Sequence, residues 1–551
     1  MTLTVLERKE SRRNSTYPLF REGGFDLDVQ RFLREENEAI ARLSEQVTHA
    51  AWMVNTTGEK KWQEAEVEAE RAYRRHFADR KRFEKIAELR EKAPEGSLER
   101  RQLDRLYQEA LENQVPEELL DEMIRLSSEL SNIFNTFRGT VDGRKVTENE
   151  VRSVLATSTD SKEREKVWRA SKQIGREVEK GLIRLVKLRN EAARRLGFED
   201  HHQMMFELSE LDRDEVFSLF GRLKGLTDEP FRRIKGEIDA ELGEKFGLEP
   251  GELRPWHYSD PFFQEAPPVT GLDMDVHYRG KNIEKLTADT FSALGLEIRD
   301  MLAKSDLYER EGKNQHAFCL DMNRRGDVRV LCNIRDNEYW MSAMLHEFGH
   351  AVYDKYVDRD LPFILRTPAH TFTTEAVAMF FGRLTRNREW LERFPRVDRE
   401  ELARIMPKVE KMLQRQMLIG ARWIITFVTF ERELYRDPDQ DLNRLWWKLV
   451  REIQYVNPPE DVDEPHWASK IHFTIAPVYY QNYLLGELTA SQFDAALRRN
   501  GATSLFTEET GRFFLEKVFW PGDRGGWRRL IEEATGEALN PEHFVNQFVR
   551  Q

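Results

Sequence analysis

The stretch Met344-Leu-His-Glu-Phe-Gly-His350 decides how this chain is interpreted, because it sets two histidines four residues apart around a glutamate. On a helix, His346 and His350 lie on one face a turn apart, so both rings can reach a single metal ion about 2 Å away. Glu347 lies beside the first of them, where it can accept a proton from a water at the open coordination position. The pattern predicts a helix that binds one Zn²⁺ per chain.

A catalytic zinc site requires a third protein ligand from a separate element. The best candidate is Glu375 in Thr371-Phe-Thr-Thr-Glu-Ala-Val-Ala-Met-Phe-Phe-Gly382. The threonines are typical of a helix N-cap, so we expect Glu375 in the first turn of a new helix that points back to the first. Asp354, one turn after His350, fits two roles equally: orienting a ligand imidazole, or lying on the surface.

The composition argues against several classes of protein. The 551 residues include 98 acidic and 86 basic side chains, interspersed, for a net charge of -12, which argues against a nucleic-acid partner. The N-terminus, Met1 to Glu10, reaches charge early, and no later stretch approaches the roughly 18 apolar residues of a membrane span. The chain has only two cysteines, Cys319 and Cys332, which excludes a disulfide framework and favours a reducing compartment. A zinc site made by these two cysteines is the less favoured alternative, because CxxC spacing is absent. We therefore expect a cytoplasmic protein without a membrane partner.

Apolar residues at spacings of three and four predict a mainly α fold. We expect helices over 27–140, with breaks near Pro94 and Pro116, over 147–248, over 282–304, and through most of the chain after 338. The highly charged segment 62–112 fits either a solvated helical hairpin or a mobile lid over a cleft.

The periodicity changes just before the zinc helix. The segments 316–322 and 327–333 resemble two short strands joined by Asn323-Arg-Arg-Gly326. An exposed strand edge at this position can align an extended peptide through main-chain hydrogen bonds. The sequence thus predicts a β-hairpin beside the metal.

Together these elements resemble the angiotensin-converting-enzyme family of zinc peptidyl-dipeptidases and, more distantly, the thimet oligopeptidase and oligoendopeptidase F group. Ala50-Ala-Trp-Met-Val-Asn-Thr-Thr-Gly58 is similar to that family's Trp-Asn-Thr segment, and Val186 to Phe198 is similar to its Arg-Asn-x-Ala-Ala-Arg helix. The resemblance implies one peptidase unit over 1–551, helical and two-lobed around a deep central cleft. Its expected parts are an N-terminal helical lid over 27–140, a helical half with a cleft wall over 147–310, and a zinc-binding catalytic half over 311–551.

The resemblance also implies residues that bind short peptides. His316-Ala-Phe-Cys-Leu-Asp321 is similar to the family's His-Ala-Ser-Ala-Trp-Asp strand, which implies that His316, Ala317 and Cys319 contact the substrate. The segment 470–483 resembles the family's Lys-Phe-His and Pro-Tyr-x-x-Tyr motifs, which implies His472 and Tyr483 as donors to the oxyanion. By the same resemblance Gln264, Lys470 and Tyr480 hold the substrate's C-terminal carboxylate. Tyr479 also fits this register, since one inserted residue is needed for the match.

The chain departs from that family at several positions. Asn482 and Val450 stand where arginines are usual, which puts chloride activation in doubt, and Met379 replaces the acid that follows the third ligand by one turn. Phe348 within the HExxH motif is typical of the thimet group. The leading hypothesis is a peptidase in which Glu347 activates water and C-terminal dipeptides are released. The alternatives are an endo-acting oligopeptidase of the thimet type and a catalytically silent peptide-binding protein.

Overall fold

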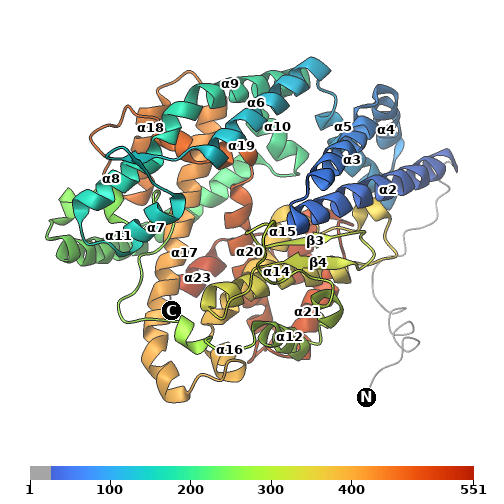
Figure 1. Ribbon diagram of the computed structural model, residues 1–551. Helices are drawn as coiled ribbons and strands as arrows, with labels where there is room; N and C mark the ends of the chain where they lie inside the picture. The colour runs from blue at the N-terminus through green and yellow to red at the C-terminus, as the bar shows by residue number, and fades with distance from the viewer. Residues whose placement is uncertain (1–26, 551) are drawn as a thin grey trace.

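The computed structural model describes residues 27–550, which fold almost entirely into helices (Figure 1). The mainly α class predicted from the periodicity is confirmed. The charged segment Met1 to Glu10 lies outside the described residues. Within residues 27–550, no helix combines the length and apolarity needed to cross a bilayer.

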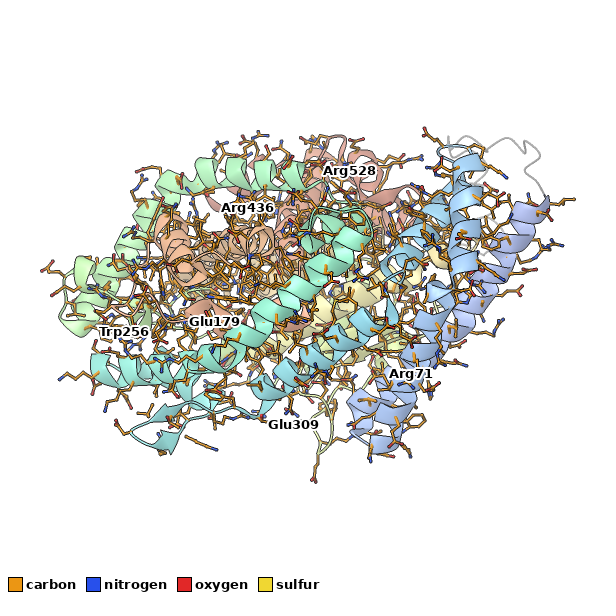
Figure 2. All side chains as sticks on the ribbon, turned by 90° about the horizontal axis from the view of Figure 1, so that it is seen from above. Arg71, Glu179, Trp256, Glu309, Arg436 and Arg528 are labelled. Atoms are coloured by element: carbon orange, nitrogen blue, oxygen red, sulfur yellow. The ribbon has the colours of Figure 1, made fainter. Side chains whose placement is uncertain are left out.

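The N-terminal helices follow the predicted breaks and add two more. They are α2 (Leu27–Thr57), α3 (Lys60–Ala78), α4 (Arg80–Lys92), α5 (Leu98–Glu112) and α6 (Glu117–Thr136). The unpredicted breaks fall at Gly58, whose φ is 65°, and at Asp79, whose side chain accepts a hydrogen bond from the backbone of Arg82 at 2.7 Å and so starts α4. Seen from above, this group lies at one side of the molecule with Arg71, while Trp256 lies at the opposite side (Figure 2).

The second helical block agrees with the prediction except for a small hairpin before it. Strands β1 (Thr140–Val141) and β2 (Arg144–Lys145) pair in antiparallel register, and a two-residue strand is too short to give a periodic signal. The helices are α7 (Glu148–Thr157), α8 (Ser161–Lys172), α9 (Ile174–Arg195), α10 (His201–Leu208) and α11 (Arg213–Phe246). Gly247 ends α11 in the left-handed conformation, as its position after the last apolar residue suggests.

The predicted hairpin before the zinc helix is confirmed. After α12 (Ile283–Ala293) and α13 (Arg299–Leu302), β3 (Phe318–Asp321) pairs antiparallel with β4 (Val328–Leu331), with Cys319 opposite Val330. Asp306 forms a parallel bridge to Leu331 on the far side of β4. Among residues 27–550, β3 pairs with β4 alone, so its other edge has unpaired main-chain groups.

The rest of the chain is helical, as predicted. Its α-helices are α14 (Glu338–Tyr356), α15 (Thr371–Gly382), α16 (Arg388–Arg393), α17 (Arg399–Arg436), α18 (Leu442–Leu449), α19 (His472–Ile475), α20 (Gln481–Arg499), α21 (Glu508–Phe513), α22 (Gly526–Thr535) and α23 (Glu542–Phe548). Short 3-10 turns lie at 250–252, 255–257, 275–277, 363–365, 383–386 and 466–469, and π-helical segments at 450–454 and 514–519.

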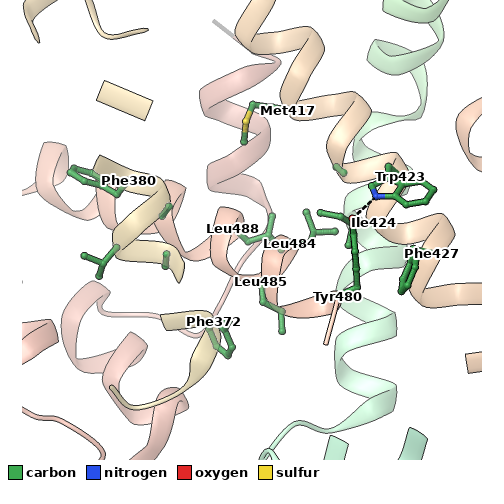
Figure 3. Packing of buried hydrophobic residues seen from close by; sticks show 14 of the residues in the cluster. Phe372, Phe380, Met417, Trp423, Ile424, Phe427, Tyr480, Leu484, Leu485 and Leu488 are labelled. Carbon is green, nitrogen blue, oxygen red and sulfur yellow. Dashed lines mark hydrogen bonds between the residues drawn. The ribbon is translucent and has the colours of Figure 1, made fainter. Parts of the chain in front are cut away.

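The main core holds α14, α15, α17 and α20 together. Phe372 and Phe380 of α15 lie opposite Leu485 and Leu488 of α20, and Trp423 of α17 borders the same cluster (Figure 3). All five side chains are buried. Burying a side chain of this size contributes about 1.5–3 kcal/mol, so the helices that carry the predicted metal ligands are among the best-anchored parts of the fold.

Candidate metal centre and peptide-binding residues

The three predicted ligands lie together. The donor atoms of His346, His350 and Glu375 are within 4.8 Å of one another, and Glu375 Oε2 is 3.8 Å from His346 Nε2 and 3.9 Å from His350 Nε2. Ligand atoms at zinc-bond lengths in a tetrahedral site are about 3.4 Å apart. The two distances from Glu375 exceed this separation by about 0.5 Å, and the nitrogen and oxygen donor set fits the ion.

Glycines allow the ligand-bearing helices to approach this closely. A Cβ on Gly349 of α14 would lie 2.8 Å from the Ala378 Cα of α15, and one on Gly486 of α20 would lie 3.1 Å from the Cβ of Glu375. Ordinary carbon contacts are about 3.5–4.0 Å. The absence of a side chain at Gly349 thus sets the spacing between the histidine helix and the glutamate helix.

The protonation states of the centre suit a cation. Burial lowers the pKa of His346 to about 4, which keeps its imidazole in the neutral form that binds metal. Burial, followed by the charge of Glu375, raises the pKa of Glu347 to about 8. Burial also raises the pKa of Glu375 to about 7, although a hydrogen bond from Tyr479 opposes the shift. Two buried carboxyl groups whose ionisation is disfavoured are the arrangement that a divalent cation stabilises.

The start of α15 differs from the prediction. His370 is the N-cap, since its ring accepts a hydrogen bond from the Phe372 N–H at 3.1 Å, and the threonines lie inside the helix. Glu375 is consequently the fifth helical residue, beyond the first turn. The expectation of a threonine cap with Glu375 in the first turn was therefore wrong. An aromatic ring acting as a cap has no strong sequence signal.

One residue that contacts a ligand imidazole was missed by sequence reasoning. Thr374 Oγ1 lies 2.7 Å from His350 Nδ1, so the hydroxyl can accept the ring proton and leave Nε2 free for the metal. Asp354, which was considered for such a role, has its carboxylate 3.9 Å from Cys319 Sγ. Thr374 immediately precedes Glu375, and its position on the ligand face of α15 was the available clue.

Strand β3 lies against the HExxH helix. The charges of Asp354 and Glu347 add to burial in raising the pKa of the Cys319 thiol, which shows that both carboxylates lie near this strand. Ala317 directly precedes β3 and is half-buried, and His316 is exposed. Cys319 is thus beside the HExxH helix, and His316 and Ala317 lie just before the strand that carries it.

The segment before β3 is held by the end of α2. Asn55 O accepts from the Asn314 N–H at 2.9 Å, and Asn314 Oδ1 in turn accepts from the His316 N–H at 2.9 Å. Gly58 and Gly312 cross at this point, and a Cβ on Gly58 would lie 2.5 Å from the Gly312 carbonyl oxygen. The Trp-Met-Val-Asn-Thr-Thr-Gly segment, whose role was not evident from the sequence, therefore fixes the start of the strand.

An aromatic wall leads away from the metal centre. The Tyr479 hydroxyl donates to Glu375 Oε1 at 3.3 Å, and its ring centroid is 5.5 Å from that of Tyr483. The Tyr483 ring is 5.3 Å from Tyr480, and the Tyr480 ring is 5.1 Å from His472. Trp423 Nε1 donates to the Tyr480 hydroxyl at 2.9 Å, which fixes this ring (Figure 3). Tyr479, left open by the sequence register, is the tyrosine that contacts the predicted ligand Glu375.

Lys470 and Gln264 lie at the far end of this wall. Lys470 Nζ donates to Gln264 Oε1 at 2.9 Å and lies 5.1 Å from the Trp423 ring and 5.8 Å from the Tyr480 ring. The lysine is buried, and burial lowers its pKa to about 8. Among residues 27–550 no carboxylate lies within ion-pair distance of it, although the charges of Asp260 and Glu265 act on it from farther away and oppose the fall in its pKa. Gln264, which is distant in the sequence, is thus brought to Lys470, and Lys470 lies beside Tyr480.

Two family comparisons bear on this arrangement. The family model described as angiotensin-converting enzyme matches residues 26–228, and the model described as peptidase family M3 matches residues 299–550. Together the two matches support an assignment to the gluzincin peptidases. No curated protein matches it. The M3 match includes all three candidate ligands, and both families are zinc metallopeptidases that hydrolyse peptides. The peptidase therefore acts on peptide substrates.

The second sequence motif of the peptidase also has a structural role. Arg189, in the Arg-Asn-x-Ala-Ala-Arg helix, donates to the carbonyl oxygens of Phe473 at 3.0 Å and Thr474 at 2.7 Å. This contact fixes the turn that begins with His472. Arg189, within the range of the angiotensin-converting-enzyme model, thus supports a turn that lies within the range of the M3 model.

Proposed function

We propose that the peptidase hydrolyses short peptides and releases dipeptides from their C-termini. The observation that carries this proposal is the buried Lys470, which has Gln264 as a hydrogen-bond partner and no carboxylate within ion-pair distance in residues 27–550. An ammonium has three donors, and a charge-assisted bond to a carboxylate is about twice as strong as a neutral one. A free substrate C-terminus would supply the missing anion.

The tyrosine wall links this cation to the metal centre. Ring contacts of 5.3 and 5.5 Å connect Tyr480 through Tyr483 to Tyr479, which contacts the predicted ligand Glu375. In this proposal a peptide held at Lys470 lies along the wall, with its second bond from the C-terminus near the metal centre.

We assign the remaining roles as follows. His346, His350 and Glu375 hold the ion. The chemistry that zinc supplies when bound is Lewis acidity toward a carbonyl and a lowered pKa of water. Glu347 accepts a proton from water as the water attacks the peptide carbonyl, and returns this proton to the leaving amine.

Hydrogen bonds from Tyr483 and His472 stabilise the oxyanion, because both groups donate where charge develops in the transition state. Tyr479 orients Glu375. The open edge of β3, with His316, Ala317 and Cys319, binds the peptide backbone as an added strand.

The domain assignments are part of the same proposal. Residues 27–140 act as a lid, 147–310 form a cleft wall, and 311–551 form the catalytic half. The free cysteines, Cys319 and Cys332, support a reducing compartment, in agreement with a cytoplasmic location.

A peptide library analysed by mass spectrometry tests the proposal. Each peptide is supplied as the free acid and as the C-terminal amide, with zinc present and after chelation. We expect zinc-dependent release of dipeptides from the acids and little cleavage of the amides. Equal cleavage of both forms at internal bonds would refute the dipeptidase assignment and leave the peptidase class intact.

An endo-acting oligopeptidase is the second candidate. The M3 model matches residues 299–550, which include the metal site, whereas the angiotensin-converting-enzyme model ends at residue 228. Phe348 within the HExxH motif favours the same alternative. The acid and amide peptides separate the two candidates. A silent peptide-binding protein is the third, and a zinc-loaded protein that cleaves no peptide in the library would support it.

A further inference from the structure

The loop that carries Gln264 has an unusual conformation and a dedicated internal support. Phe263 has a φ of 51°, in the left-handed region that non-glycine residues rarely adopt. Asp260, 5% exposed, accepts hydrogen bonds from the N–H groups of Phe262 at 2.9 Å, Gln264 at 3.0 Å and Glu265 at 3.0 Å. Strained residues of this kind persist only where the surroundings hold them in place.

A second buried side chain holds the same loop from the opposite side. Gln454, in the π-helical segment 450–454, donates from Nε2 to the carbonyl oxygens of Phe262 at 3.1 Å and Phe263 at 2.8 Å. Its side chain is fully buried, and its Oε1 has no hydrogen-bond partner among the described residues, so the amide is directed at the loop through Nε2. The N–H groups of the loop are thus bound by Asp260 and its carbonyl groups by Gln454.

Phe262, in the same loop, separates two buried lysines. Lys172 Nζ lies 3.2 Å from the centre of the Phe262 ring, and Lys470 Nζ lies 5.2 Å from it. A rotation of the loop would therefore move both the amide that contacts Lys470 and the ring on which Lys470 rests. Two of the groups that contact the Lys470 ammonium, the Gln264 amide and the Phe262 ring, thus belong to this loop.

We propose that Asp260 and Gln454 are positioning residues that fix Gln264 and, through it, direct the Lys470 ammonium toward the C-terminal carboxylate of the substrate. This inference rests on the proposed function, because it assumes that Lys470 binds that carboxylate. The two residues do not touch substrate. They act by removing the freedom of a strained loop before the substrate binds, which lowers the cost of ordering it on binding.

The test compares one peptide as its free acid and as its C-terminal amide. In Asp260→Asn, the new amide group faces two N–H donors, and the charge of Asp260 that acts on Lys470 is removed as well. In Gln454→Met the donor to both carbonyl groups is lost without a change of charge, so this variant isolates the effect of the loop. For both variants we expect the ratio of kcat/KM for acid over amide to fall about ten- to a hundredfold, mainly through the KM of the acid. Gln264→Leu should reproduce this fall.

Gln492→Met is the matched control. Gln492 is also a buried amide that donates to backbone carbonyl groups, those of Glu537 at 3.3 Å and Ala538 at 3.1 Å, but it lies outside the loop and the site. We expect it to lower the melting temperature and leave the acid-to-amide ratio unchanged. Folded Asp260→Asn and Gln454→Met proteins that keep the wild-type ratio would overturn the positioning role alone. A wild-type ratio near one would overturn the carboxylate role of Lys470 as well.

Discussion

Gly349→Ala is expected to disturb the metal centre through helix spacing alone. The new Cβ would lie 2.8 Å from Ala378 Cα and 3.3 Å from both Ala378 N and Phe381 Cδ2. A carbon contact needs about 3.5 Å, so α14 and α15 must separate by about 0.7 Å. Backbone atoms on the opposing side cannot rotate away. The substitution therefore widens a ligand set whose nitrogen and oxygen atoms are already 3.8 and 3.9 Å apart.

The magnitudes follow from these distances. Overpacking a core contact costs about 1–3 kcal/mol, and the helical gain from replacing glycine with alanine returns about 0.5–1 kcal/mol. We expect a net loss of about 1–2 kcal/mol in the free energy of unfolding. Zinc affinity should fall about ten- to a hundredfold, the range seen when the surroundings of a zinc site are disturbed.

The assay is competition for zinc with a chelator of known affinity, combined with urea unfolding of the metal-free protein. Gly420→Ala in α17 is the control, because no atom lies within 4 Å of its added Cβ. That variant should be more stable by about 0.5–1 kcal/mol and bind zinc normally. Wild-type zinc affinity in Gly349→Ala would refute the role assigned to helix spacing.

Three further predictions follow from the described contacts. Removing zinc by dialysis against a chelator should lower the melting temperature and abolish cleavage, since a ligand at a thousand times its Kd stabilises the folded state by about 4 kcal/mol; an unchanged melting temperature would argue against a structural contribution from the ion. Glu347→Gln should retain zinc and lose about 10²–10⁴-fold in kcat, measured on the best library peptide. Arg101→Met removes the hydrogen bonds from α5 to Glu210 and Asp523. It should lower the free energy of unfolding, measured in urea, by about 3 kcal/mol. This is the low end for a broken buried ion pair, because Arg105 still contacts Asp523 at 3.2 Å. Burial alone would raise the pKa of Glu210, but the bonds and charge of Arg101 outweigh it and lower the pKa to about 2. The stability that ionised Glu210 contributes is therefore present above its unfolded pKa of about 4.3 and is lost as the pH falls toward 2. In Arg101→Met the free energy of unfolding should depend less on pH over this range.

The sequence predicted most of the fold because its signals are local. Helical periodicity and prolines located the helix breaks near Pro94 and Pro116, and the spacing of His346 and His350 located the first two ligands. The break at Asp79 gave no comparable signal, because a capping aspartate in a charged segment looks like any surface acid. The strands at 140–145 were missed because a strand of two residues is too short to show the alternation of apolar and polar residues that identifies a strand.

The candidate site was predictable where chemistry repeats a known motif and not where it depends on packing. The mutual approach of His346, His350 and Glu375 followed from the motif. The contact of Thr374 with His350 depends on how α14 and α15 approach each other at Gly349. The contact of Tyr479 with Glu375 depends on how α15 and α20 approach each other at Gly486. Such inter-helix distances are set by glycines and core volumes far apart in the sequence, and no local pattern encodes them.

The crossing of Gly58 and Gly312 has a consequence for how this chain can be recombined. Each glycine has a positive φ, and a Cβ on either one would meet the backbone of the other segment, at 2.5 Å from the Gly312 oxygen or 2.8 Å from the Thr57 oxygen. A larger residue in either segment therefore cannot be accommodated by trimming a side chain in the other. A chimera that takes α2 from one relative and the strand from another should assemble only if both parents keep this glycine pair. The crossing thus defines a compatibility rule for exchanging the two parts of the molecule.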